Sequence, residues 1–128
     1  MLRVSQFAAL RPGAIALAVV LMLPSPASAQ DYFGAIAYSW ETGAHGWANV
    51  YPSREAAEQT ALSICSQHAR DCRPAIWFRN ACGALAHGPN GPGWAWETSK
   101  AAAEKKALEL CAKRSTGCAV ARSFCTNR

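Results

Sequence analysis

From residue 34 onward, the apolar residues of this chain recur with two different periods. Over 34–39 and 83–88, larger residues alternate with alanine, which is the period-two pattern of a half-buried strand. A glycine-containing loop and a second short segment follow each of these stretches, at 46–48 and 93–95. Each pair of segments therefore predicts a β-hairpin.

Helical periodicity follows each hairpin. Ser53 and Ser99 are placed to cap two helices, because a serine hydroxyl can accept a hydrogen bond from a free amide of the first turn. The residues at spacings of four, three and one are Ala57, Ala61, Ile64 and Cys65 in the first helix and Ala103, Ala107, Leu110 and Cys111 in the second. Alanine on such a face lets a helix lie close to a sheet. Apolar segments at 74–78 and 119–124 then complete a β-β-α-β pattern in each half.

The two halves are copies of one unit. Residues 53–72 and 99–118, aligned at a constant offset of 46, share eight of 20 positions. Such regularity indicates a tandem repeat, with units of about 32–80 and 81–128. We expect the two units to share one antiparallel sheet with both helices packed on it, which makes a single α+β domain.

The first 29 residues have the pattern of a signal peptide. Arg3 and Arg11 precede an apolar run at 14–23 that is too short to span a bilayer, and 27–29 form an Ala-x-Ala cleavage signature. The mature chain is expected to begin at Gln30 and to have no stable membrane insertion. Loss of the two arginines lowers the net charge from +5 to +3. No run of Lys or Arg remains that would indicate nucleic-acid binding.

All six cysteines lie in the mature chain, and an even number in an exported protein predicts disulfides. Repeat equivalence predicts which cysteines pair: Cys65–Cys72 and Cys111–Cys118 are equivalent, which leaves Cys82–Cys125. A zinc site is the alternative, but the chain has no C-x2-C pair. We therefore expect three disulfides and no metal.

Several phrases of the mature chain resemble one bacterial family. They are Gly-Ala-Ile-Ala-Tyr-Ser at 34–39, Trp-Phe-Arg-Asn-Ala-Cys-Gly-Ala-Leu-Ala at 77–86 and Gly-Trp-Ala-Trp at 93–96, together with the paired alanine-rich helices. In these the chain is similar to the family of domains of unknown function numbered 4189. The resemblance implies a small exported protein built of a tandem repeat. It implies no catalytic mechanism.

No residue pattern indicates catalysis or a cofactor. The three histidines, His45, His68 and His87, lie in or beside loops at spacings typical of surface residues rather than of a metal site. The cysteines are expected to be bridged, so none is a free nucleophile. Glu41 and Glu97 each follow a tryptophan, but at non-equivalent places in the repeat, so we do not interpret them as a glycosidase pair.

The tryptophans are the candidate binding residues. Trp47 and Trp94 are repeat equivalents and are expected in the core, whereas Trp40 and Trp96 have no equivalents and flank loops. Exposed aromatic residues suit contacts with proteins or with sugar rings. The alternative is that all the tryptophans serve the small core. Arg79, before the second unit, is a candidate surface contact.

These observations predict an exported, non-catalytic binding module that contacts a protein partner, with an inhibitor, immunity-type or effector role. It would work in the periplasm or outside the cell. One alternative is a protein that binds envelope glycans through exposed tryptophans. A weaker one is a hydrolase whose site the sequence does not reveal.

Overall fold

The computed structural model describes residues 12–24 and 30–126. The two arginines of the predicted leader and its cleavage site lie outside the described residues. Within the leader, residues 12–24 form no helix or strand and are exposed. None of the helices in the described part of the chain has the length and apolarity to cross a membrane.

The chain folds as two β-β-α-β units, as the sequence predicted. The first contains β1 (Phe33–Tyr38), β2 (His45–Tyr51), α1 (Arg54–Ser66) and β3 (Arg73–Arg79). The second contains β4 (Cys82–Gly88), β5 (Gly91–Glu97), α2 (Lys100–Ala112) and β6 (Ala119–Cys125). Each helix begins directly after its predicted cap: the Ser53 hydroxyl accepts a hydrogen bond from the Ala56 amide at 3.1 Å, and the Ser99 hydroxyl accepts one from the Ala102 amide at 3.2 Å.

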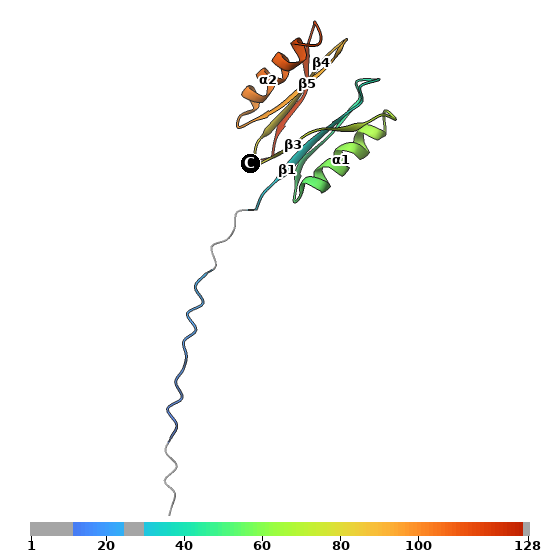
Figure 1. Ribbon diagram of the computed structural model, residues 1–128. Coiled ribbons are helices and arrows are strands. Elements are labelled where there is room, and N and C mark those ends of the chain that lie inside the picture. The colour runs from blue at the N-terminus through green and yellow to red at the C-terminus, as the bar shows by residue number, and fades with distance from the viewer. Residues whose placement is uncertain (1–11, 25–29, 127–128) are drawn as a thin grey trace, which may run out of the picture.

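The prediction that both units share one sheet is wrong. Each unit has its own three-stranded antiparallel sheet, in the order β2-β1-β3 and β5-β4-β6. In Figure 1 the two sheets face each other, and α1 and α2 cover their outer faces. The central strands β1 and β4 therefore have apolar neighbours on both sides, so both faces are buried rather than one.

The alternation of large and small residues matches these two environments. In β1, Ala35 and Ala37 pack against α1, whereas Ile36 and Tyr38 belong to a cluster between the sheets. Leu85 of β4 joins that same inter-sheet cluster. Small residues thus face the helices and large residues fill the space between the sheets.

Two glycines let the helices approach the sheets. A Cβ atom added to Gly46 would lie 2.0 Å from the carbonyl oxygen of Ala61, and one added to Gly93 would lie 2.2 Å from the amide nitrogen of Cys111. Both neighbours are helix backbone atoms, so neither can move aside cheaply. The close helix–sheet contact therefore requires glycine at these equivalent positions.

The three disulfides form as predicted, at Cys65–Cys72, Cys111–Cys118 and Cys82–Cys125. The first two each close the loop after a helix, whereas Cys82 and Cys125 are cross-strand partners on β4 and β6. The disulfides and the exposed apolar stretch at 14–23 together indicate an exported protein.

Matching hydrogen-bonded turns close the two units. Asn80, which has a positive φ of 49°, donates its amide hydrogen to the Tyr32 carbonyl at 2.9 Å and accepts the Tyr32 amide on its side-chain oxygen at 2.9 Å. In the second unit Thr126 makes the corresponding pair with Ala81, at 2.9 and 3.0 Å.

Candidate functional site

Trp40 joins the two units at one end of the sandwich. It follows β1, and 51% of its surface is exposed. Its ring lies edge-on to Trp94, with 6.1 Å between centroids, and the guanidinium of Arg114 lies 5.2 Å from its centroid. A side chain of the first unit is thus held by residues of the second while half of its surface stays open to solvent.

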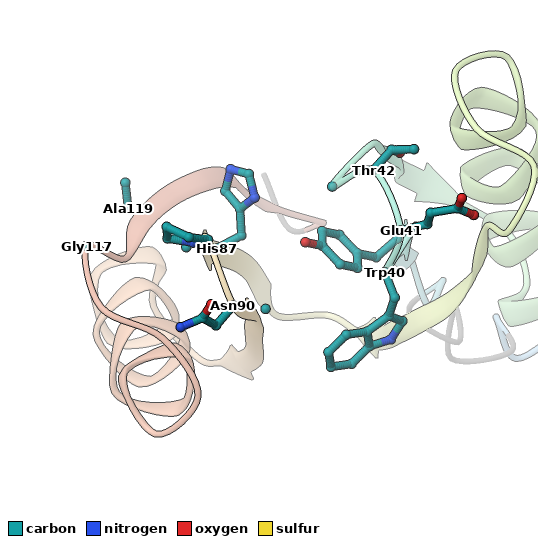
Figure 2. A pocket seen from close by; sticks show the side chains of 12 residues that line it. Trp40, Glu41, Thr42, His87, Asn90, Gly117 and Ala119 are labelled. Carbon is teal, nitrogen blue, oxygen red and sulfur yellow. The ribbon is translucent and has the colours of Figure 1, made fainter.

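A cleft of about 540 Å³ opens beside Trp40. It lies between the loop after β1 and the turn that joins β4 to β5, and Tyr38 also lines it. Figure 2 shows His87 and Asn90 across the cleft from Trp40, while the carboxylate of Glu41 points away. Burial raises the pKa of the Tyr38 hydroxyl, which is protonated at neutral pH even at the ordinary pKa of tyrosine. The cleft offers an aromatic face and hydrogen-bonding groups.

The loop that carries Trp40 is fastened by a buried serine. The Ser39 hydroxyl donates a hydrogen bond to the Asp71 carboxylate, and the Glu41 amide donates to the other oxygen of that carboxylate at 3.0 Å. The Thr42 amide in turn donates to the Ser39 hydroxyl at 3.1 Å. The hydrogen bond from Ser39, and after it the one from the Glu41 amide, lower the pKa of Asp71. The loop is thereby tied to the Cys65–Cys72 loop.

A second hollow, the β3–β5 groove, contains the other predicted site residues. It has a volume of about 560 Å³ and is lined by Ala75, Ile76, Trp77, Phe78, Arg79 and Trp96. Trp96 is 53% exposed and Trp77 is 39% exposed. Both β3 and β5 are edge strands of their sheets, so the groove also borders backbone that pairs with no strand of the described residues on its outer side.

Trp96 and Arg79 thus meet in one groove, whereas Trp40 lies in the separate cleft. Trp40 and Trp96, the two binding candidates, are both exposed, and Trp47 and Trp94 pack against the inter-sheet cluster as expected. Arg79 makes a surface ion pair with Asp31 at 3.7 Å. Such an exposed pair contributes little to stability, so Arg79 is available for other contacts.

Sequence reasoning missed Trp77 as a surface residue. The guanidinium carbon of Arg54 lies 4.6 Å from the centroid of the Trp77 ring. The ring centroids of Phe33 and Trp77 are 6.3 Å apart. A signal was present, because the repeat-equivalent position holds the polar Ser123. An aromatic residue where the other copy tolerates serine indicates a position that the shared core does not require.

The three histidines fall in two places. His87 lines the cleft beside Trp40, whereas His45 and His68 line a hollow with Trp47 and Arg122. Burial, and then the charge of Arg122, lower the pKa of His45. No group of three His, Cys, Asp or Glu residues able to hold a metal ion occurs within 12–24 and 30–126.

Comparisons with known proteins place the chain among domains without an assigned activity. The model of a domain of unknown function, DUF4189, matches residues 33–125, from the first residue of β1 to the last of β6. Protein Rv1269c of Mycobacterium tuberculosis and Protein Mb1300c of Mycobacterium bovis are each 47% identical to this chain over 60 residues. That match covers 47% of this chain and 45% of each relative, less than half of its length. No solved structure matches the chain.

Proposed function

Since the chain belongs to the DUF4189 family, whose function is unknown, we propose a function from its geometry: an exported, non-catalytic binding module. Its partner would be a protein, bound in the β3–β5 groove. The observation that carries the proposal is the exposure of Trp96, at 53%, beside Trp77, at 39%, in a groove of about 560 Å³. Tryptophan and arginine are the residue types most enriched at the energetic centres of protein interfaces.

The edge strands add a way to bind the partner. An extended segment lying along β3 could pair with its free backbone groups while its side chains contact Trp77 and Trp96. Arg79 at the end of β3 would meet the polar rim of such an interface. An inhibitor, immunity-type or effector role fits this mode of contact, in the periplasm or outside the cell.

The first test captures a partner from envelope extract with the tagged exported protein and then measures its affinity by calorimetry. Trp96→Ala should weaken binding by about 2 kcal/mol, roughly thirtyfold, because it removes an aromatic anchor that the bound partner would bury. Arg79→Ala should weaken it less, since Arg79 lies at the rim. Circular dichroism controls for folding.

The matched control is Val50→Ala. Val50 is an exposed apolar residue, at 42%, on β2 rather than beside the groove. This variant should bind normally, as should alanine variants of His45, His68 and His87, none of which lines the groove. Normal binding by both Trp96→Ala and Trp77→Ala would exclude the groove. Loss of an activity in one histidine variant alone would point to an enzyme instead.

The cleft beside Trp40 favours a second candidate, an envelope glycan binder. Its half-exposed indole lies opposite His87 and Asn90, which is the combination of aromatic face and hydrogen-bonding groups that binds a sugar ring. Titration with soluble envelope glycan fragments distinguishes the candidates. Glycan binding that Trp40→Ala abolishes and Trp96→Ala preserves would assign this function to the cleft.

A further inference from the structure

A third hollow, on the side of the sandwich where β2 and β6 lie, is built around a stacked arginine. It has a volume of about 510 Å³ and is lined by Thr42, Gly43, Ala44, His45, Trp47, His68 and Arg122. Arg122 comes from β6 of the second unit, and its guanidinium carbon lies only 3.6 Å from the ring centroid of Trp47 on β2. The stacking holds the cation in one place across the junction of the two units.

Arg122 has no anionic partner among the described residues. Its Nε atom is buried and has no hydrogen-bond acceptor there, and none of the three ion pairs in that part of the chain includes it. A ligand in the hollow does not reach this buried atom, so an anion would pair with the guanidinium charge at the terminal nitrogens. The Asp71 carboxylate accepts hydrogen bonds from the Ser39 hydroxyl and the Glu41 amide, and it forms no ion pair with Arg122.

The fold itself does not require a cation at this position. At the offset of 46, the equivalent of Arg122 is Ile76 on β3, which packs against the same inter-sheet cluster as Trp94. An isoleucine therefore occupies the equivalent position in the other unit. The arginine brings a charge and a set of N–H donors that packing alone would not select.

The two histidines that line the hollow can also donate hydrogen bonds from their ring nitrogens. His45 comes from β2, and His68 comes from the loop after α1, so with Arg122 the donors belong to three different segments. Donors that approach from several directions suit a tetrahedral group better than a planar carboxylate. Because Nε is buried, such a group would reach the guanidinium through its terminal nitrogens.

We propose that this hollow is a binding site for a phosphate group, held by Arg122 with His45 and His68. The site is separate from the β3–β5 groove and does not depend on the function proposed for it. Arginine forms charge-assisted, frequently bidentate hydrogen bonds with phosphate, which would balance a charge that has no ion pair within 12–24 and 30–126.

The test titrates the exported protein with inorganic phosphate at constant ionic strength. It follows the NMR signals of the Arg122 Nε–H and the His45 ring, and the melting temperature. We expect saturable shifts of both signals and a rise in melting temperature, because a ligand that binds only the native state stabilises it. Sodium chloride at the same ionic strength should produce neither. No saturable response to phosphate, or an equal response to chloride, would overturn the proposal.

Two variants separate a site from a general salt effect. Arg122→Met keeps an apolar chain on Trp47 and should weaken phosphate binding at least tenfold. Arg54→Met is the control, because Arg54 also stacks on a tryptophan but already has an ion pair with Glu58. It should bind phosphate as the wild type does. If Arg122→Met fails to fold, Arg122→Ile copies the residue of the other unit. Wild-type affinity in a folded Arg122 variant would contradict the site.

A vesicle-binding experiment identifies the source of the phosphate group. Vesicles of phosphatidylcholine with and without phosphatidylglycerol are mixed with the wild type and with Arg122→Met. Binding to the phosphatidylglycerol vesicles that requires Arg122 would assign a lipid headgroup. Phosphate binding without vesicle binding would assign a free or small-molecule phosphate.

Discussion

At the scale of single residues, the close approach of helix to sheet depends on glycine. The Cβ positions of Gly46 and Gly93 are already filled by backbone atoms of α1 and α2. Backbone atoms of a helix cannot turn aside as a flexible side chain can. The two glycines therefore determine how deeply each helix lies on its sheet.

We predict that Gly93→Ala destabilises the protein by about 1–3 kcal/mol, because the added methyl group forces α2 away from β5. Chemical denaturation followed by circular dichroism measures the loss. Lys105→Ala, at an exposed position on α2, is the control and should change the stability by less than about 0.5 kcal/mol. Equal stabilities of the two variants would show that the helix can shift at little cost.

The Asp71 carboxylate, also a single-residue feature, makes a pH-dependent contribution to the free energy of unfolding. Its pKa is lowered in the folded protein, first by the Ser39 hydrogen bond. A depressed folded pKa means that the ionised form stabilises the fold above the unfolded pKa, near 4. This contribution is lost as the pH falls from about 4 through the folded pKa.

Asp71→Asn should therefore be less stable than the wild type at neutral pH, and the difference should shrink as the pH falls below about 4. Unfolding free energies measured between neutral and acidic pH test this. Glu109→Gln, an exposed carboxylate variant on α2, should show no such convergence. A difference between Asp71→Asn and wild type that stays constant down to the most acidic pH would refute the assignment.

At the scale of elements, the disulfides divide into two kinds. Cys65–Cys72 and Cys111–Cys118 each have a sequence separation of 7 and close the turn after a helix. Cys82–Cys125 has a separation of 43 and joins β4 to β6 around the whole second unit. In the chain-entropy description, the bridge that closes the longer loop restricts the unfolded chain more.

Removal of Cys82–Cys125 should therefore cost more stability than removal of Cys65–Cys72, about 4 against 2.5 kcal/mol. Paired alanine variants, Cys82→Ala with Cys125→Ala and Cys65→Ala with Cys72→Ala, avoid a leftover thiol. Thermal unfolding of both variants provides the measurement. Identical melting temperatures would mean that local packing, rather than loop length, determines the contribution of each bridge.

At the scale of the whole molecule, Phe78 holds the two units together. It belongs to β3, yet its ring fills the space above glycines of both units: a Cβ atom at Gly34 or at Gly83 would lie 2.6 or 2.1 Å from it. Its ring centroid is 5.3 Å from that of Phe124 on β6. Phe78 therefore contacts both units within the inter-sheet cluster.

Phe78→Ala should destabilise the protein by about 3–5 kcal/mol, because it leaves a cavity between the sheets. Trp77→Ala on the same strand is the control and should cost less, since that side chain is 39% exposed. Denaturation curves of both variants measure the loss in free energy of unfolding. A smaller loss for Phe78→Ala than for Trp77→Ala would mean that the inter-sheet contact contributes little.

The sequence by itself determined whatever depends on neighbours along the chain or on the repeat. Strand and helix periods, the caps Ser53 and Ser99, and the disulfide pairing all follow from local spacing and from the equivalence of the two copies. The lack of a repeat equivalent marked Trp40 and Trp96 as candidates for exposure, and the structure shows both exposed.

Only the tertiary structure decided how the two copies meet. An alternation of alanine with larger residues is compatible with strands paired edge to edge in one sheet and with sheets packed face to face, and packing of both faces of β1 and β4 selects the second arrangement. The same packing separates Trp40 from Trp96 and brings Arg122 onto Trp47. Distances between residues of different copies depend on this contact between the sheets, and spacing along the chain does not encode them.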